Sequence, residues 1–173
     1  MSRWKPPIWF PFPYRHSMPE PSFVEIKDLP TCCPGTSSAT VLAYSGTVRL
    51  MYETRDSPWP DSDSWAVIRF HDCGPYHGGG PNDEAVHNHR LYKHGLLGYS
   101  IQEVLNSPWL REQNALKHRD GNPDTPLARR RHFILALKET LFECAADGYS
   151  LVGEFNSSEA AYRALCGLDE PSR

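Results

Sequence analysis

Short stretches in which apolar and polar residues alternate recur from residue 22 onward, and this period of two constrains the fold most strongly. In the stretch 47–54, Val48, Leu50 and Tyr52 alternate with polar residues such as Arg49. Successive side chains of a β-strand point to opposite faces of a sheet, so this pattern indicates a strand with one buried face. Similar runs bounded by turn-forming residues predict strands at 23–26, 40–44, 65–70 and 96–105.

Residues 132–146 fit two patterns. Phe133, Leu135 and Leu137 alternate as in a strand, whereas Phe133, Ala136, Leu137, Thr140, Leu141 and Cys144 would form one stripe on a helix. The β-rich surroundings favour a hairpin, with its turn near Lys138-Glu139 and a return strand that contains Phe142 and Cys144.

Two short helices carry recognisable end signals. Ser107 is suited to cap a helix over 108–117, and Pro108 fits its first position because that N–H is unpaired in any helix. A second helix over 157–166 begins at a Ser and Asn cap with Glu159 in its first turn, and Gly167 ends it.

These elements predict an α+β fold that is mainly antiparallel β, either a sandwich or an open barrel with two short helices. A length of 173 residues suits a single globular domain, which we place at 22–173. Residues 1–21 form an N-terminal arm rich in aromatic residues and proline. Two interpretations of the arm remain open: it packs on its own domain, or it covers a partner subunit in a homodimer.

Composition excludes several classes of protein. A mean hydropathy of −0.55 without a long apolar run argues against a membrane-spanning helix. A net charge of −3 argues against a dedicated nucleic-acid binder. Prolines interrupt the apolar stretch that a secretory signal needs, and the five cysteines show no Cys-x-x-Cys spacing. We therefore expect a cytoplasmic protein with reduced thiols.

The segment 71–94 departs from the periodic pattern and concentrates polar side chains. Five of the eight histidines lie in it, together with three carboxylates and the run Gly78-Gly79-Gly80. Long irregular segments inside compact domains often carry function, although His and Asp in such loops also serve simply to hold the backbone in place.

Imidazole and carboxylate side chains are ligands for transition metal ions. The candidate ligands in this segment are His77, Asp83, Glu84, His87, His89 and His94. An extended backbone would place His87 and His89 on one face, whereas a helical turn that begins at Asn82 would instead bring Asp83 beside His87. The sequence leaves these two geometries open.

A second set of candidates lies in the predicted strands. Glu103 and Glu143 would be buried carboxylates with raised pKa if they point inward, which suits a general acid or base, and ordinary solvated residues if they point outward. Arg131 and His132 are available as partners for a buried carboxylate, so the candidate acid–base set is Glu103, Glu143 and His132.

Residues 65–146 resemble a family of small microbial proteins without an established activity. The resemblance rests on the runs Pro81-Asn82-Asp83-Glu84, His89-Arg90-Leu91-Tyr92, Gly95-Leu96, Glu103-Val104, Asn106-Ser107, His132-Phe133 and Phe142-Glu143-Cys144, with Tyr99 and Trp109. It implies no reaction and no ligand, and it groups the irregular segment with the two later strands as one unit.

Three functions fit these observations. The first is a soluble domain that binds a small molecule or a protein partner in a pocket, rimmed by residues 71–94 and floored by Tyr99, Glu103 and the 132–146 hairpin. The second is a small metal-dependent enzyme, hydrolytic or oxygen-using, with ligands from the same segment and an open position for water or substrate. The third is a cofactor-free acid–base catalyst.

Overall fold

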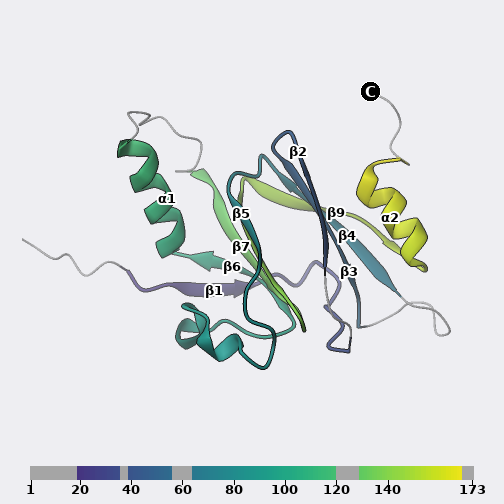
Figure 1. Ribbon diagram of the computed structural model, residues 1–173, viewed down its shortest axis with the longest axis horizontal. Coiled ribbons are helices and arrows are strands. Elements are labelled where there is room, and N and C mark those ends of the chain that lie inside the picture. Colours follow the sequence, from purple (N-terminus) through teal and green to yellow (C-terminus); the bar gives the residue numbers. More distant parts are fainter. Residues whose placement is uncertain (1–18, 36–38, 56–63, 120–128, 169–173) are drawn as a thin grey trace, which may run out of the picture.

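The computed structural model of the protein describes residues 19–35, 39–55, 64–119 and 129–168. These residues form two antiparallel sheets that pack face to face as a sandwich, with one α-helix beside each sheet (Figure 1). The α+β class is therefore confirmed, and of the two predicted architectures the sandwich is present and the open barrel is not.

The five-stranded sheet contains, in spatial order, β1 (Ser22–Glu25), β6 (Ser100–Leu105), β7 (Arg131–Ala136), β8 (Leu141–Ala146) and β5 (Tyr76–Gly79). The four-stranded sheet contains β2 (Thr40–Tyr44), β3 (Thr47–Glu53), β4 (Trp65–His71) and β9 (Gly148–Phe155). The α-helices are α1 (Pro108–Arg119) and α2 (Ser158–Cys166), and two short 3-10 helices are η1 (Val86–Asn88) and η2 (Tyr92–His94).

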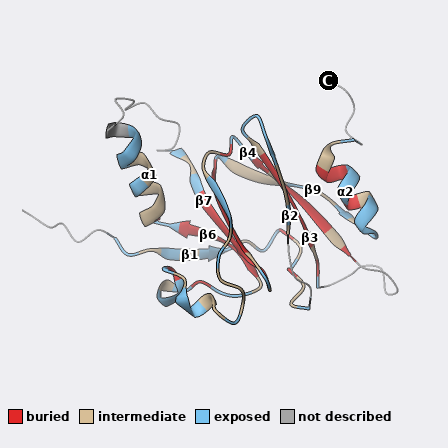
Figure 2. Ribbon diagram, in the orientation of Figure 1, coloured by how far each residue is buried: buried red, intermediate tan, exposed pale blue. Residues whose placement is uncertain are grey.

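The core lies between the two sheets, where the buried faces of the strands meet (Figure 2). The ring of Phe70 on β4 lies 5.5 Å from that of Phe133 on β7 and 5.7 Å from that of Phe142 on β8, measured between ring centroids. Alternate residues of both sheets, among them Leu50 and Ile68, complete this cluster. The apolar residues of the alternating pattern in the sequence are thus those on the inner faces of the two sheets, which form the core.

The outer face of the five-stranded sheet is also largely covered. The irregular segment between β5 and β6 packs Leu91 and Leu96 onto Val104, Ile134 and Leu141 of the sheet. This second apolar cluster explains why β7 and β8 are buried on both faces and read as nearly continuous apolar runs.

Helix α2 covers the outer face of the four-stranded sheet through Ala161, Ala164 and Leu165. The guanidinium of Arg49, a fully buried residue of β3, donates a 2.6 Å hydrogen bond to the carbonyl of Ala164 and a longer one to that of Leu165. A cation at this position donates to carbonyls that have no partner within the helix, and it interacts favourably with the negative end of the helix dipole.

Most of the predicted elements are confirmed. Residues 131–146 form a β-hairpin, with the turn at Leu137–Thr140 closed by a 2.9 Å hydrogen bond from Leu137 N–H to the carbonyl of Thr140. Both helices form near their predicted ranges, and Ser157 caps α2 by accepting from Ala160 N–H at 3.3 Å.

Three expectations need correction or fall outside the described residues. The strand predicted at 96–105 begins only at Ser100, because residues 96–99 turn over the sheet with Tyr99 at φ +54°. The segment 71–94 contains strand β5, and β9 was not predicted. Nearly all of the N-terminal arm, residues 1–18, lies outside the described residues. Within the described part of the chain, no helix has the length and apolar character needed to cross a membrane.

Replacing Gly167 with alanine is expected to lower the free energy of unfolding by about 1–2 kcal/mol, because φ is +72° and the added Cβ would lie 2.9 Å from Nη1 of Arg49. Urea denaturation measures the change. Gly148→Ala is the matched control, since its Cβ meets no atom within 4 Å and its φ lies outside the left-handed region. Equal unfolding midpoints for the two variants would contradict the role of this C-cap.

Candidate functional site

The carboxylate of Glu143 is buried on the outer face of the five-stranded sheet, where only 3% of its side chain is exposed. One oxygen accepts from Nη2 of Arg90 at 2.6 Å and from Nε2 of His132 at 2.9 Å, and the other faces Nε2 of His89 at 3.3 Å. Three donors therefore surround one carboxylate, the arrangement that a buried charge requires.

The β7–β8 hairpin brings His132 to Glu143. Ile134 of β7 lies directly opposite Glu143 of β8, and His132 lies opposite Ala145. Residues two apart on a strand share a face, so His132 and Glu143 are diagonal neighbours within reach of long side chains. Both side chains are almost wholly buried, with 0% of His132 exposed.

The other two donors come from the segment between η1 and η2. His89 is 7% exposed at its side chain, while 47% of the Arg90 side chain is exposed to solvent. Nδ1 of His89 accepts from Leu91 N–H at 3.3 Å, so the ring proton lies on Nε2, which faces Glu143. Arg90 is thus the point at which this buried network reaches the surface.

His132 extends the network in the other direction, to Ser107 at the start of α1. The Oγ of Ser107 lies 2.8 Å from Nδ1 of His132 and also accepts from Leu110 N–H at 3.1 Å. Because Nε2–H donates to the carboxylate, Nδ1 is an acceptor and the Ser107 hydroxyl donates to it. The indole of Trp109 packs against the imidazole at an interplanar angle of 55°, with 4.9 Å between the ring centroids.

The surroundings set different charge states for the two central groups, Glu143 and His132. Burial raises the pKa of Glu143, but hydrogen bonds from His132 and His89 and the charge of Arg90 outweigh it and hold the pKa below its ordinary range. Burial lowers the pKa of His132, and the hydrogen bond to Glu143 offsets this only in part. Glu143 is therefore ionised and His132 neutral near pH 7.

Glu103 does not join this network. It pairs in register with Phe133, whereas Glu143 pairs with Ile134, the next residue of β7, so the two carboxylates lie on opposite faces of the sheet. Glu103 is 15% exposed at its side chain and forms a two-point ion pair with Arg131 at 2.9 and 2.6 Å. Glu103 is thus separated from Glu143 and His132, which the structure brings together.

The raised pKa expected for an inward-pointing glutamate is also wrong for Glu143. The sequence reasoning considered burial and one partner. The segment that carries His89 and Arg90 supplies two further donors, and together with His132 they reverse the sign of the shift.

The six candidate metal ligands are dispersed. His77, Glu84 and His87 are exposed, while Asp83 accepts hydrogen bonds from the Tyr99 hydroxyl and from Glu84 N–H. Nδ1 of His94 lies 3.3 Å from Oε2 of Glu20, and His89 faces Glu143. Across residues 19–35, 39–55, 64–119 and 129–168, no group of three His, Cys, Asp or Glu side chains could hold a metal ion.

Sequence reasoning missed three members of the network. Ser107 was identified only as a helix cap, a role that it does perform, and Arg90 and Trp109 were not singled out. For Ser107 the sequence does contain a signal. A predicted strand, a polar turn and a Ser-Pro helix start follow one another, and this order places the serine beside the end of a sheet.

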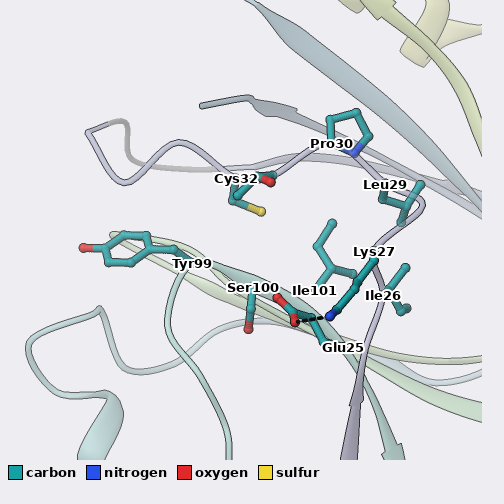
Figure 3. Close-up of a pocket in the computed structure, with 10 residues that line it drawn as sticks. Glu25, Ile26, Lys27, Leu29, Pro30, Cys32, Tyr99, Ser100 and Ile101 are labelled. Atoms are coloured by element: carbon teal, nitrogen blue, oxygen red, sulfur yellow. Dashed lines mark ion pairs between the residues drawn. The ribbon is translucent and has the colours of Figure 1, made fainter. Parts of the chain in front are cut away.

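A cavity of about 310 Å³ lies at one end of the sandwich, between the β1–β2 connection and the start of β6 (Figure 3). Its lining residues are Glu25, Ile26, Lys27, Leu29, Pro30, Thr31, Cys32, Tyr99, Ser100 and Ile101. Tyr99 alone comes from the floor predicted for a pocket. The segment 71–94 does not line this cavity, and the pocket predicted at that segment stays a prediction.

The segment nevertheless positions one wall of the cavity. The hydroxyl of Tyr99 donates to Asp83, and Ser100 Oγ donates to the carbonyl of Leu97 at 2.8 Å. Burial raises the pKa of the Cys32 thiol to about 12, so the sulfur that lines the cavity is protonated. The cavity thus offers an aromatic ring and a neutral thiol, with its ionised groups on Glu25 and Lys27.

No family model, curated protein or solved structure matches this chain. The resemblance to a family of small microbial proteins therefore stays a prediction.

The folded protein is expected to lose stability as the pH falls below about 6.5, because unfolded His132 binds a proton that the buried ring resists. A second loss follows below about pH 4, where unfolded Glu143 becomes protonated before the folded carboxylate does. Urea denaturation as a function of pH measures both losses.

His132→Gln should flatten the profile below about pH 6.5, where one proton contributes at most about 1.4 kcal/mol per pH unit. His87→Gln, at an exposed histidine in η1, is the control and should follow the wild-type profile. Parallel profiles for wild type and His132→Gln would contradict the neutral state of His132.

Proposed function

We propose that this chain is a ligand-binding domain whose cavity at the end of the sandwich takes a small organic cation, such as a primary amine. The observation that carries the proposal is the cavity itself, because about 310 Å³ lies within the range of small-molecule pockets. Its lining places the apolar side chains of Ile26, Leu29 and Ile101 beside polar groups that make up most of its accessible surface, which suits a small ligand with a polar or charged end.

The charged pair at the cavity supports a ligand with an ionised group. Nζ of Lys27 lies 3.9 Å from Oε2 of Glu25, and the two side chains are 82% and 51% exposed. An exposed ion pair of this kind contributes little free energy, so a ligand can replace one partner at small cost. Figure 3 shows the two side chains joined by this ion pair, drawn as a dashed line.

The sign of the ligand's charge follows from which partner of the ion pair stays in the cavity. Lys27 is the more exposed partner and can turn to solvent, which leaves the Glu25 carboxylate for a ligand ammonium group. Tyr99 also lines the cavity, but its ring extends away from Glu25 and Lys27 in Figure 3, so the preference for a cation rests on the Glu25 carboxylate. Among the described residues, Lys27 is the only cationic side chain in the lining that could favour an anion.

Amine binding should perturb the methyl NMR signals of Ile26, Leu29 and Ile101. We expect butylamine and tyramine to cause saturable shifts at millimolar concentration, and butyrate and 4-hydroxyphenylpropionate to cause none. Glu25→Gln should weaken amine binding by about two- to fivefold, as expected for loss of a partly exposed charged partner.

Glu84→Gln is the matched control, since Glu84 is exposed and lies outside the cavity lining. It should bind the amines like wild type. Shifts with the carboxylates instead of the amines, or none with either set, would contradict the proposal.

A further inference from the structure

We propose that Ser107, His132 and Glu143 form a nucleophile relay that hydrolyses carboxylic esters with short apolar acyl groups. The three side chains make one continuous hydrogen-bonded chain, 2.8 Å from Ser107 Oγ to His132 Nδ1 and 2.9 Å from His132 Nε2 to Glu143 Oε2. A hydroxyl, an imidazole that accepts its proton and a carboxylate that orients the imidazole are the three parts of serine catalysis. This activity is independent of the amine cavity.

The proton positions suit the relay. Glu143 accepts from three donors and therefore holds the Nε2–H tautomer of His132. That tautomer leaves the Nδ1 lone pair directed at the Ser107 hydroxyl. In the serine protease template, Nε2 of the imidazole faces the serine and Nδ1–H donates to the carboxylate, whereas in His132 these two roles are exchanged. Either nitrogen can transfer the serine proton when the other donates to a carboxylate.

Ser107 lies at a strand–turn–helix junction. Strand β6 ends at Leu105, Asn106 adopts the left-handed conformation with φ +54°, and α1 begins at Pro108. In the N-terminal turn of this 12-residue helix, Pro108 has no N–H and Leu110 N–H already donates to Ser107 Oγ, so Trp109 N–H and the positive end of the helix dipole are what the turn presents at this point. Negative charge that develops on a substrate oxygen beside Ser107 is stabilised there.

Access to the hydroxyl depends on Trp109. Ser107 is only 4% exposed and the indole packs against His132, whereas Asn106 and Leu105 beside it are exposed. Among the α1 side chains that the structure describes, residues 108–117, none is buried, so the helix is held to the sheet by few contacts. Displacing one indole ring uncovers the relay and gives an acyl chain an apolar surface.

The reaction balances with water as the only other reactant. Ser107 Oγ attacks the acyl carbon, its proton passes to His132 Nδ1, and the bond to the alkoxy oxygen breaks as that oxygen takes the proton. Water then attacks the acyl-serine, and His132 transfers the water proton to Ser107 Oγ as the acid leaves. Glu143 stays ionised throughout and stabilises the imidazolium.

The test uses the full chain and a fluorophosphonate probe, which forms an Oγ–P bond as fluoride and the hydroxyl proton leave. Peptide mass spectrometry should locate the label on Ser107. Ser157 is an internal control, because it caps α2 in the same way, accepting from Ala160 N–H at 3.3 Å, and is exposed to solvent. It should remain unlabelled.

His132→Gln should slow the labelling of Ser107 about 100-fold or more, the usual contribution of a general base. Trp109→Ala should accelerate labelling by uncovering the hydroxyl. Hydrolysis of p-nitrophenyl butyrate should be lost in Ser107→Ala and kept in Ser157→Ala, with circular dichroism confirming that each variant folds.

A readout on the wild-type protein avoids any folding defect of the variants. The labelling rate should fall on acidification as His132 becomes protonated, with Glu143, His89 and Arg90 as the charged or titratable groups around it. Absence of label on Ser107, equal labelling of Ser157, an unchanged rate in folded His132→Gln, or a rate independent of pH would each overturn the proposal.

Discussion

The hydrogen bonds to the buried carboxylate of Glu143 connect three parts of the chain that the sandwich core does not hold together. The hairpin supplies Glu143 and His132, the irregular segment supplies His89 and Arg90, and Ser107 at the start of α1 joins through His132. A buried charge is tolerated only when it is paired, so each partner is held where the carboxylate requires it. The apolar contacts of Leu91 and Leu96 stabilise the same arrangement.

The hydrogen-bond network around Glu143 also affects the cavity proposed as a binding site. The segment that carries His89 and Arg90 continues to Tyr99, whose ring lines the cavity and whose hydroxyl donates to Asp83 of the same segment. The cavity wall is therefore fixed from both ends, by the carboxylate network at one end and by strand β6 at the other. One irregular segment thus contributes to the Glu143 network on the outer face and, through Tyr99, to the wall of the cavity.

The sequence allowed much of the fold to be predicted, because period-two alternation and helix caps are local signals. The hairpin at 131–146 and both helices follow from them. Strand β5 was missed because its Gly78 and Gly79 are poor strand formers, and it forms by pairing with β8. The candidate site was harder to predict than the fold. Whether Glu103 and Glu143 share a face of the sheet depends on how β6 and β8 pair in register with β7, and the alternation within a single strand does not specify that register.

The charge state of His132 provides the most direct test of this account. Long-range ¹⁵N–¹H NMR of the histidine rings, with His132 assigned by its absence in His132→Gln, reports the tautomer and protonation of each imidazole. At pH 7 we expect His132 to be neutral with its proton on Nε2, facing an ionised Glu143. A charged imidazolium, or a neutral ring with its proton on Nδ1, would contradict this account. The hydrogen bonds to Glu143 and the proposed Ser107–His132–Glu143 relay both depend on a neutral His132 with its proton on Nε2.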